Sequence, residues 1–296
     1  MDKDIGEGVF ESWEESANQG NAEAQWRLGN CYALGKGVGQ DGKKAAELFE
    51  KSANQGNAEG QWRLGICYEK GVGVDMDPRK AAECYEKAFE LFELSANQGN
   101  AEAQFRLGIY YEKGCWSVHQ DLKKAAEWYE KSAKQGNADG QLSSGYCYEN
   151  GVGVSPDGKK AAEWYEKSAN QGNAEGQLLL GICYENGKGV SQDTKKAAEW
   201  YEKSAKQDNA DGQWRLGACY AHGLGVHHDP RKAAGLFEKS ANQGNADGQW
   251  RLGACYAHGL GVIRDFKKAF ELFELSAMQG NAEAIKLMQK LKRSKG

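Results

Sequence analysis

The four-residue string Gln-Gly-Asn-Ala recurs along the chain and sets a period for nearly all of it. The string starts at Gln19, Gln55, Gln98, Gln135, Gln171, Gln243 and Gln279, and a close copy, Gln-Asp-Asn-Ala, starts at Gln207. Most intervals are 36 residues, one is 43 and one is 37. A fixed period of about 20–50 residues indicates a solenoid in which each repeat is one supersecondary unit. We therefore expect one continuous body over residues 1–296 rather than two globular domains.

Each period is predicted to form two antiparallel helices, A and B. In the first complete unit Asn21 suits the start of helix A, and Leu28 and Tyr32 share one of its faces. Gly35 suits the positive φ of a helix end, and Asp41 suits the start of helix B. The pattern predicts an all-α fold with seven repeats over residues 21–278. Residues 4–18 form a capping half-repeat, and a polar helix over residues 281–295 closes the stack.

Two adjacent irregularities interrupt the period. In the 43-residue interval, Lys80–Glu86 is followed by a near copy, Lys87–Glu93. Seven residues are almost two helical turns, so we expect a longer helix B whose face rotates by about 20°, with a kink or a bulged connection as the alternative. The next loop, Gly114–Val118, is one residue longer than usual and carries Trp116. These two irregularities mark either a secondary binding locus or an insertion that a surface loop tolerates.

Composition narrows the possible functions. The net charge is −4 with both signs interspersed, which argues against nucleic-acid binding. No apolar run is long enough for membrane insertion and no secretory signal is readable, so we expect a cytoplasmic protein. We expect it to be a monomer, with an oligomer as the alternative. Six of the eight cysteines hold one equivalent position per repeat, which predicts buried thiols. We expect no metal site and no cofactor, because paired-cysteine spacing and phosphate-binding motifs are absent.

The repeated pattern Ala-Glu-Ala-Gln-x-x-Leu-Gly-x-x-Tyr, Gly-x-Gly-Val and Asp-x-x-Lys-Ala resembles the Sel-1-like repeat family, a relative of the tetratricopeptide repeat. The resemblance covers the chain from about Glu7 to Lys290. It implies an α/α superhelix, a right-handed solenoid with a concave groove, and work as an adaptor for protein complexes. The family that it resembles includes a secreted, cysteine-rich subgroup for which an enzyme-like role is proposed. This chain departs from that subgroup by having one cysteine per repeat.

Alignment with the tetratricopeptide pattern places two rows of helix A residues on the predicted concave face. The acidic row is Glu23, Glu59, Glu102, Asp139, Glu175, Asp211, Asp247 and Glu283, and the apolar row is Trp26, Trp62, Phe105, Leu142, Leu178, Trp214 and Trp250. Exposed tryptophans are suitable anchors for a partner. The acids could instead complement the helix dipole, and the tryptophans could fill the space between adjacent A helices. The arginines that follow the aromatic residues are predicted to pair with acids of a neighbouring repeat.

These residues predict a scaffold that binds a protein or peptide on its concave face. The sequence shows no catalytic constellation, since His222 and His258 end equivalent A helices and His227 and His228 follow in a loop. Two alternatives stay open. One is an enzyme-like role in cell-envelope or peptide metabolism, and the other is a purely structural, consensus-type array.

Overall fold

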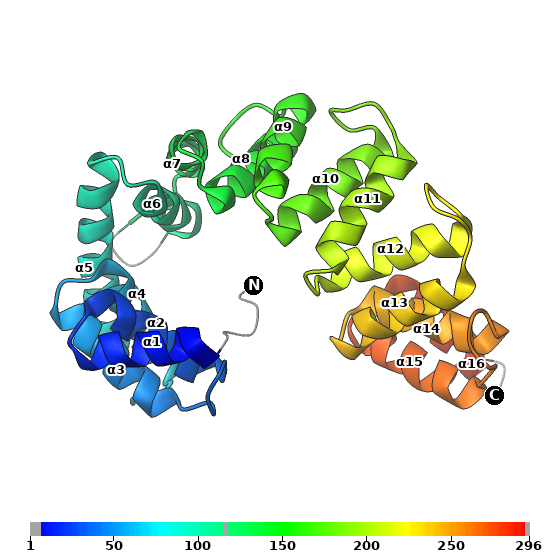
Figure 1. Ribbon diagram of the computed structural model, residues 1–296, viewed down its shortest axis with the longest axis horizontal. Helices are drawn as coiled ribbons and strands as arrows, with labels where there is room; N and C mark the ends of the chain where they lie inside the picture. Colours follow the sequence, from blue (N-terminus) through cyan, green and yellow to red (C-terminus); the bar gives the residue numbers. More distant parts are fainter. Residues whose placement is uncertain (1–6, 115–117, 294–296) are drawn as a thin grey trace. The chain divides into compact units, whose positions relative to one another are not determined.

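The computed structural model describes residues 7–114 and 118–293, and within these ranges it contains sixteen α-helices and no β-strand (Figure 1). The predicted all-α repeat fold is confirmed. The A helices are α2 (Ala22–Leu34), α4 (Ala58–Lys70), α6 (Ala101–Lys113), α8 (Ala138–Asn150), α10 (Ala174–Asn186), α12 (Ala210–His222) and α14 (Ala246–His258). The B helices are α3 (Gly42–Asn54), α5 (Pro78–Asn97), α7 (Leu122–Lys134), α9 (Gly158–Asn170), α11 (Thr194–Ala205), α13 (Pro230–Asn242) and α15 (Phe266–Met278). Single helices begin and end the described chain: α1 (Glu7–Asn18) and α16 (Ala282–Arg293).

The chain divides into two compact units, Met1–Ser155 and Pro156–Gly296. Unit 1 holds α1 to α8 and unit 2 holds α9 to α16, so the boundary falls in the loop inside the fourth repeat. Within each unit, helices that follow one another in the chain pack together. One body over residues 1–296 stays a prediction.

The helix ends follow the predicted capping pattern. The Asn21 side chain accepts a hydrogen bond from the Ala24 backbone N–H at 2.9 Å, and α2 ends at Gly35 with φ 68°. At the start of α3, Asp41 accepts from the Lys44 N–H at 3.0 Å. These contacts satisfy backbone donors and acceptors that a helix end leaves without intrahelical partners.

The core of a repeat forms where an aromatic residue of helix B meets a glycine of helix A. A methyl group built on Gly29 would lie 2.8 Å from the Phe49 ring, so only glycine permits this contact. Phe49 is buried, together with Leu28 and Cys31. The prediction of buried thiols is confirmed for the six equivalent cysteines; Cys84 is buried as well, and none of these seven takes part in a disulfide. Cys115 and Trp116 lie outside the described residues.

The 43-residue interval produces one continuous helix, as predicted. Helix α5 is 20 residues long, whereas α3 has 13. Its buried residues keep a helical spacing of three or four over the whole length, at Ala81, Tyr85, Ala88, Phe92 and Ala96. The duplicated segment therefore lengthens the helix without changing the face that it buries.

Candidate functional site

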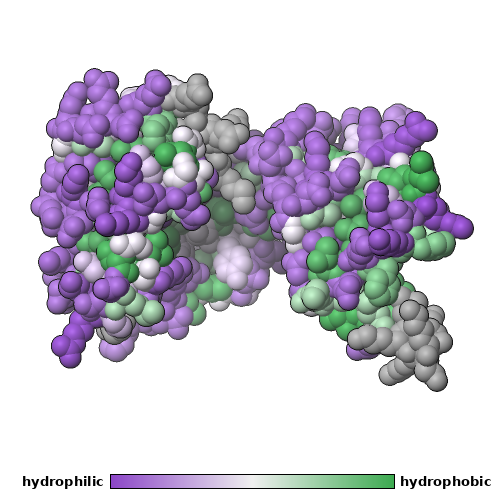
Figure 2. Space-filling view, turned by 90° about the horizontal axis from the view of Figure 1, so that it is seen from below, coloured by the Kyte–Doolittle hydropathy of each residue, from purple (hydrophilic) through white to green (hydrophobic). Residues whose placement is uncertain are grey.

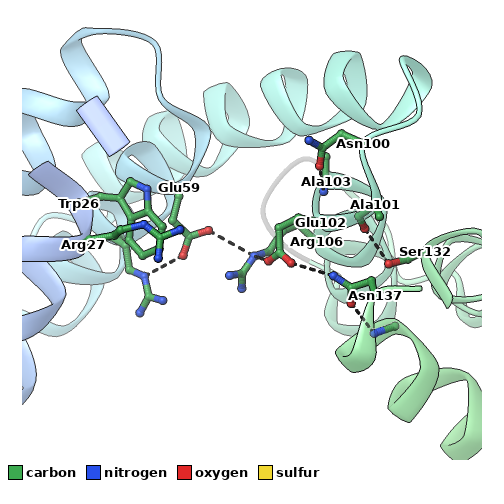
Figure 3. Close-up of polar contacts among 12 residues, drawn as sticks. Trp26, Arg27, Glu59, Asn100, Ala101, Glu102, Ala103, Arg106, Ser132 and Asn137 are labelled. Atoms are coloured by element: carbon green, nitrogen blue, oxygen red, sulfur yellow. Dashed lines mark hydrogen bonds and ion pairs between the residues drawn. The ribbon is translucent and has the colours of Figure 1, made fainter. Parts of the chain in front are cut away.

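The A helices of unit 1 form one wall of an open cleft of about 660 Å³, a volume within the usual range for ligand sites. The first turns of α2, α4 and α6 line it, and Phe92 and Ser95 come from the end of α5. Four residues predicted for partner binding lie in this cleft, namely Glu23, Trp26, Glu59 and Glu102. Figure 3 shows these helix starts with their polar side chains.

A charge network joins α4 to α6 inside the cleft. Glu59 is only 8% exposed; its Oε1 accepts from Arg63 Nε at 2.9 Å, and its Oε2 forms an ion pair with Arg106, 3.2 Å from Nε. Arg106 also lies 3.0 Å from Glu102 Oε1, and Glu102 Oε2 accepts from the Asn137 amide at 3.0 Å. In Figure 3, Arg106 reaches from α6 toward Glu59. Buried charges need such partners, because an unpaired carboxylate in this position would be costly.

Trp26 and Arg27 form the α2 side of the cleft. The Trp26 indole N–H donates to Glu23 Oε2 at 2.7 Å, so it already has an acceptor within its own helix. The Arg27 guanidinium pairs with Glu23 at 2.8 Å and lies 4.8 Å from the centre of the Trp26 ring. The predicted anchor is thus half-buried and held under a stacked arginine.

The other predicted aromatic residues of unit 1 pack between helices. The Trp62 ring lies 5.1 Å from the Tyr85 ring and 4.8 Å from the Tyr110 ring, and Phe105 lies 5.8 Å from Tyr129. Leu142 in α8 is half-buried. These positions match the alternative in which the apolar row fills space between adjacent helices.

In unit 2 the predicted residues are engaged by their neighbours. Asp211 accepts from the Trp214 indole N–H at 2.9 Å and from the Asn245 amide at 3.0 Å, and Asp247 accepts from the Asn281 amide at 2.9 Å. Two guanidinium groups lie close to the centre of the Trp214 ring, that of Arg215 at 4.5 Å and that of Arg251 at 4.8 Å. Trp250 packs against Phe273 at 4.8 Å and lines an apolar pocket of about 490 Å³.

Leu178 requires a correction. It is 3% exposed and belongs to a core cluster with Tyr201 and Leu216, so no partner can reach its side chain. The row to which it belongs points into the space between helices. A leucine is short enough to lie wholly inside that space, whereas the larger tryptophans keep part of the ring exposed.

The prediction for the arginines is confirmed in two cases. Arg106 pairs with Glu59 of the preceding repeat, and Arg215 pairs with Glu185 of the preceding repeat at 3.1 Å. Arg27 and Arg63 instead pair with acids four residues earlier in their own helices. Arg251 has no ion pair among the described residues, and burial lowers the pKa of its guanidinium from the ordinary value. The spacing i, i+4 explains the intrahelical pairs.

Sequence reasoning missed the polar groups that face the cleft beside the acids. Asn57 and Asn100 cap α4 and α6 through their side-chain oxygens, at 2.8 Å and 2.9 Å. Neither amide N–H₂ has an acceptor within the described part of the chain. Ser95 also faces the cleft without a hydrogen-bond partner there. The 43-residue interval between Gln55 and Gln98 was the sequence signal that could have located these groups.

The described residues also lack metal-binding groups and membrane-spanning helices. They contain no group of three or more His, Cys, Asp and Glu side chains that could hold a metal ion. No helix among them is both long and apolar enough to cross a bilayer. On the face that Figure 2 displays, hydrophilic residues cover most of each unit, with hydrophobic residues in smaller patches.

Paired helices with a repeating glycine–aromatic contact define the protein as an α-helical repeat protein. The Sel1 repeat model matches eight segments, 22–57, 58–91, 85–100, 101–137, 138–173, 174–209, 210–245 and 246–281. The chain therefore belongs to the Sel1 repeat family, as the sequence pattern indicated. The short match over 85–100 overlaps its predecessor and coincides with the lengthened part of α5. Proteins of this family typically act as scaffolds for protein–protein interactions and are generally not enzymes.

Two solved structures are similar to this chain. One is a protective antigen of uropathogenic Escherichia coli strains that displays an SLR fold, with 36% sequence identity and a TM-score of 0.64. The match covers 93% of this chain but only 57% of that protein, so this chain spans little more than half its length. The other is a Sel1 repeat protein from Oxalobacter formigenes, with 32% identity, a TM-score of 0.65 and coverage of 96% and 80%. None of the curated proteins that were compared is detectably similar.

Proposed function

We propose that this protein is a scaffold that binds a partner protein through the cleft of unit 1. The observation that carries the proposal is the cleft itself, which exposes Glu23, Trp26 and Glu102 beside amide and hydroxyl groups that have no partner. Binding sites of this size with a few convergent polar groups and an aromatic side chain suit specific recognition. The seven described cysteines, none in a disulfide, fit the predicted cytoplasmic location.

The cleft differs from the matching surface of unit 2 in whether the capping asparagine amides remain free to bind a partner. In unit 2, Asp211 and Asp247 each accept from the capping asparagine of the next repeat. In unit 1, Asn57 and Asn100 form no such bond with Glu23 or Glu59, and they face the cleft instead. The amide N–H₂ groups of Asn57 and Asn100 are therefore available to a partner without breaking an existing contact.

The experiment compares two variants with matched chemistry. The cleft variant carries Glu23→Gln, Arg27→Gln and Glu102→Gln, and the control carries Asp211→Asn and Asp247→Asn. We expect a partner captured from native lysate by the parent to be retained by the control and lost by the cleft variant, provided that both variants keep the parent's helicity. Equal capture by the parent and the cleft variant would contradict the proposal.

A further inference from the structure

Three kinds of hydrogen bond recur in the regular repeats: two join helix B to helix A of the same repeat, and the third joins a repeat to the one before it. A serine of helix B donates to the first carbonyl of the preceding helix A at 2.6–2.8 Å, in Ser52–Ala22, Ser132–Ala101, Ser204–Ala174, Ser240–Ala210 and Ser276–Ala246. A glutamine amide donates to a glutamine oxygen at 2.6–2.9 Å, in Gln55–Gln25, Gln135–Gln104, Gln207–Gln177, Gln243–Gln213 and Gln279–Gln249. A capping asparagine donates to the acid of the preceding repeat at 2.9–3.1 Å, in Asn137–Glu102, Asn209–Glu175, Asn245–Asp211 and Asn281–Asp247.

All three bonds are missing around α5: the serine and glutamine bonds within the second repeat, and the asparagine bond between the second and third repeats. Within the described residues no hydrogen bond joins the equivalent pairs there, Ser95–Ala58, Gln98–Gln61 and Asn100–Glu59. The asparagine bond is also missing between Asn57 and Glu23, although the first repeat keeps its serine and glutamine bonds. The five serines bonded to the preceding helix are 0% exposed, whereas Ser95 is half-buried. Figure 3 shows the Asn137 amide joined to Glu102 while the Asn100 amide lies apart from Glu59.

The lengthened helix α5 explains why these bonds are missing. Its first copy packs against α4, because a methyl group on Gly65 would lie 2.7 Å from the Tyr85 ring. Its second copy packs against α6, where Phe92 joins the core cluster and the Ala96 carbonyl accepts from Gln104. Ser95 follows the second copy, so it lies seven residues, about 10 Å along the helix, beyond the place from which it could reach α4.

The missing bonds leave matched groups on two sides of the cleft. The Ala58 carbonyl stands on the α4 side as an acceptor, and Ser95 and Asn100 stand on the other side as donors. In the other repeats described above, the serine bonds directly to this carbonyl. Here the space between them is open; the Ala58 carbonyl keeps its intrahelical bond, and its second lone pair and the Ser95 and Asn100 donors are left to a ligand or water.

We propose that this gap binds an extended polypeptide segment through its main chain. A trans peptide group points its N–H and its C=O in opposite directions, so one group can donate to the Ala58 carbonyl and accept from Ser95 or Asn100. The segment thereby replaces the contacts that the seven extra residues removed. This inference rests on the proposed scaffold function and adds the chemical class of the ligand and the place where it lies.

Deletion of residues 88–94 supplies the main test. The shortened helix would read Asp-Pro-Arg-Lys-Ala-Ala-Glu-Cys-Tyr-Glu-Lys-Ser-Ala-Asn-Gln-Gly-Asn, which restores the 36-residue interval and closely matches residues 229–245. It brings Ser95 back to the register of Ser52, so the gap should close. Asn100→Ser is a milder second variant, because serine still caps the helix but has no amide donor. Asn21→Ser is its matched control, since Asn21 caps α2 outside the cleft.

The probe is a fluorescein-labelled dodecapeptide selected on the full chain from a phage-displayed random library and measured by fluorescence polarisation. We expect the deletion to abolish binding and Asn100→Ser to weaken it about tenfold, as the loss of roughly one hydrogen bond would do. Asn21→Ser should bind as the parent does. A version of the peptide with one N-methylated backbone amide at the contact should also lose binding.

Three results would overturn the inference. They are a library that yields no binding peptide, a peptide that binds the deletion variant as well as the parent, and insensitivity to both Asn100→Ser and backbone N-methylation. Partner capture that still depends on Glu23, Arg27 and Glu102 would then leave the scaffold function standing. If one of these results is obtained and partner capture is also unaffected by the substitutions at Glu23, Arg27 and Glu102, both proposals are wrong.

Discussion

Close contact between Gly217 of α12 and Phe237 of α13 predicts that alanine at this position destabilises the protein. A methyl carbon built on Gly217 would lie 2.7 Å from Phe237 Cε1, 2.9 Å from Cδ1 and 3.3 Å from the Ala233 carbonyl oxygen. Phe237 is buried, so its ring has little room to move away. Overpacking of this kind costs about 1–3 kcal/mol, and the better helix propensity of alanine returns about 1 kcal/mol. Because two carbons of this buried ring lie under 3.0 Å away, the upper half of the overpacking range applies, about 2–3 kcal/mol, and the net loss is roughly 1–2 kcal/mol.

Gly235 in α13 provides the control within the same repeat. A methyl carbon there would have no other atom within 4 Å, and the residue lies inside a helix on its exposed face. Gly235→Ala should therefore stabilise the protein by about 1 kcal/mol. Urea unfolding followed by far-UV circular dichroism measures both variants through the shift of the midpoint. A Gly217→Ala variant as stable as the parent, or more stable, would refute the argument that this glycine exists for close packing.

Two further predictions test the buried thiols and the serine bonds within the repeats. Burial, with a smaller contribution from Glu112, raises the pKa of the Cys147 thiol from 9.0 to about 12. The unfolded chain releases this proton above pH 9 while the native protein keeps it, so the free energy of unfolding should fall as pH rises from 9 to 12. Urea titrations should show a smaller fall for Cys147→Ala, and equal falls would contradict the assignment. Ser204→Ala should cost about 1–2 kcal/mol, because it leaves the Ala174 carbonyl without its serine donor, whereas Ser95→Ala should cost almost nothing. Thermal unfolding of the two serine variants decides this, and equal losses would mean that Ser95 is bonded after all.

Local signals predicted the fold well. Asparagine, aspartate and glycine at fixed positions set the start and end of each helix, and their hydrogen bonds are local in sequence. The duplicated segment 80–93 predicted a longer α5 for the same reason, since seven residues preserve the buried face of a helix. These are properties that a single sequence contains without knowledge of neighbouring repeats.

The site was harder to predict, because it depends on contacts between repeats. The period placed Glu23, Trp26, Glu59 and Glu102 together correctly, but it could not show that Leu178 is buried. The sequence also could not tell which copy in α5 packs against α4 and which against α6. That division of contacts decides where Ser95 and Asn100 lie, and so whether the cleft exists. Trp116, the predicted secondary locus, lies outside the described residues and stays a prediction.

The central claim is that the cleft of unit 1 is the surface that a partner occupies. Hydrogen–deuterium exchange of the full chain, with and without a captured partner, tests it most directly, because the first-turn amides of a helix have no intrahelical acceptor and exchange readily. We expect slower exchange at the starts of α2, α4 and α6 and at the end of α5, around Ser95, when the partner is bound. Slower exchange confined to other helices, with these four places unchanged, would contradict the account.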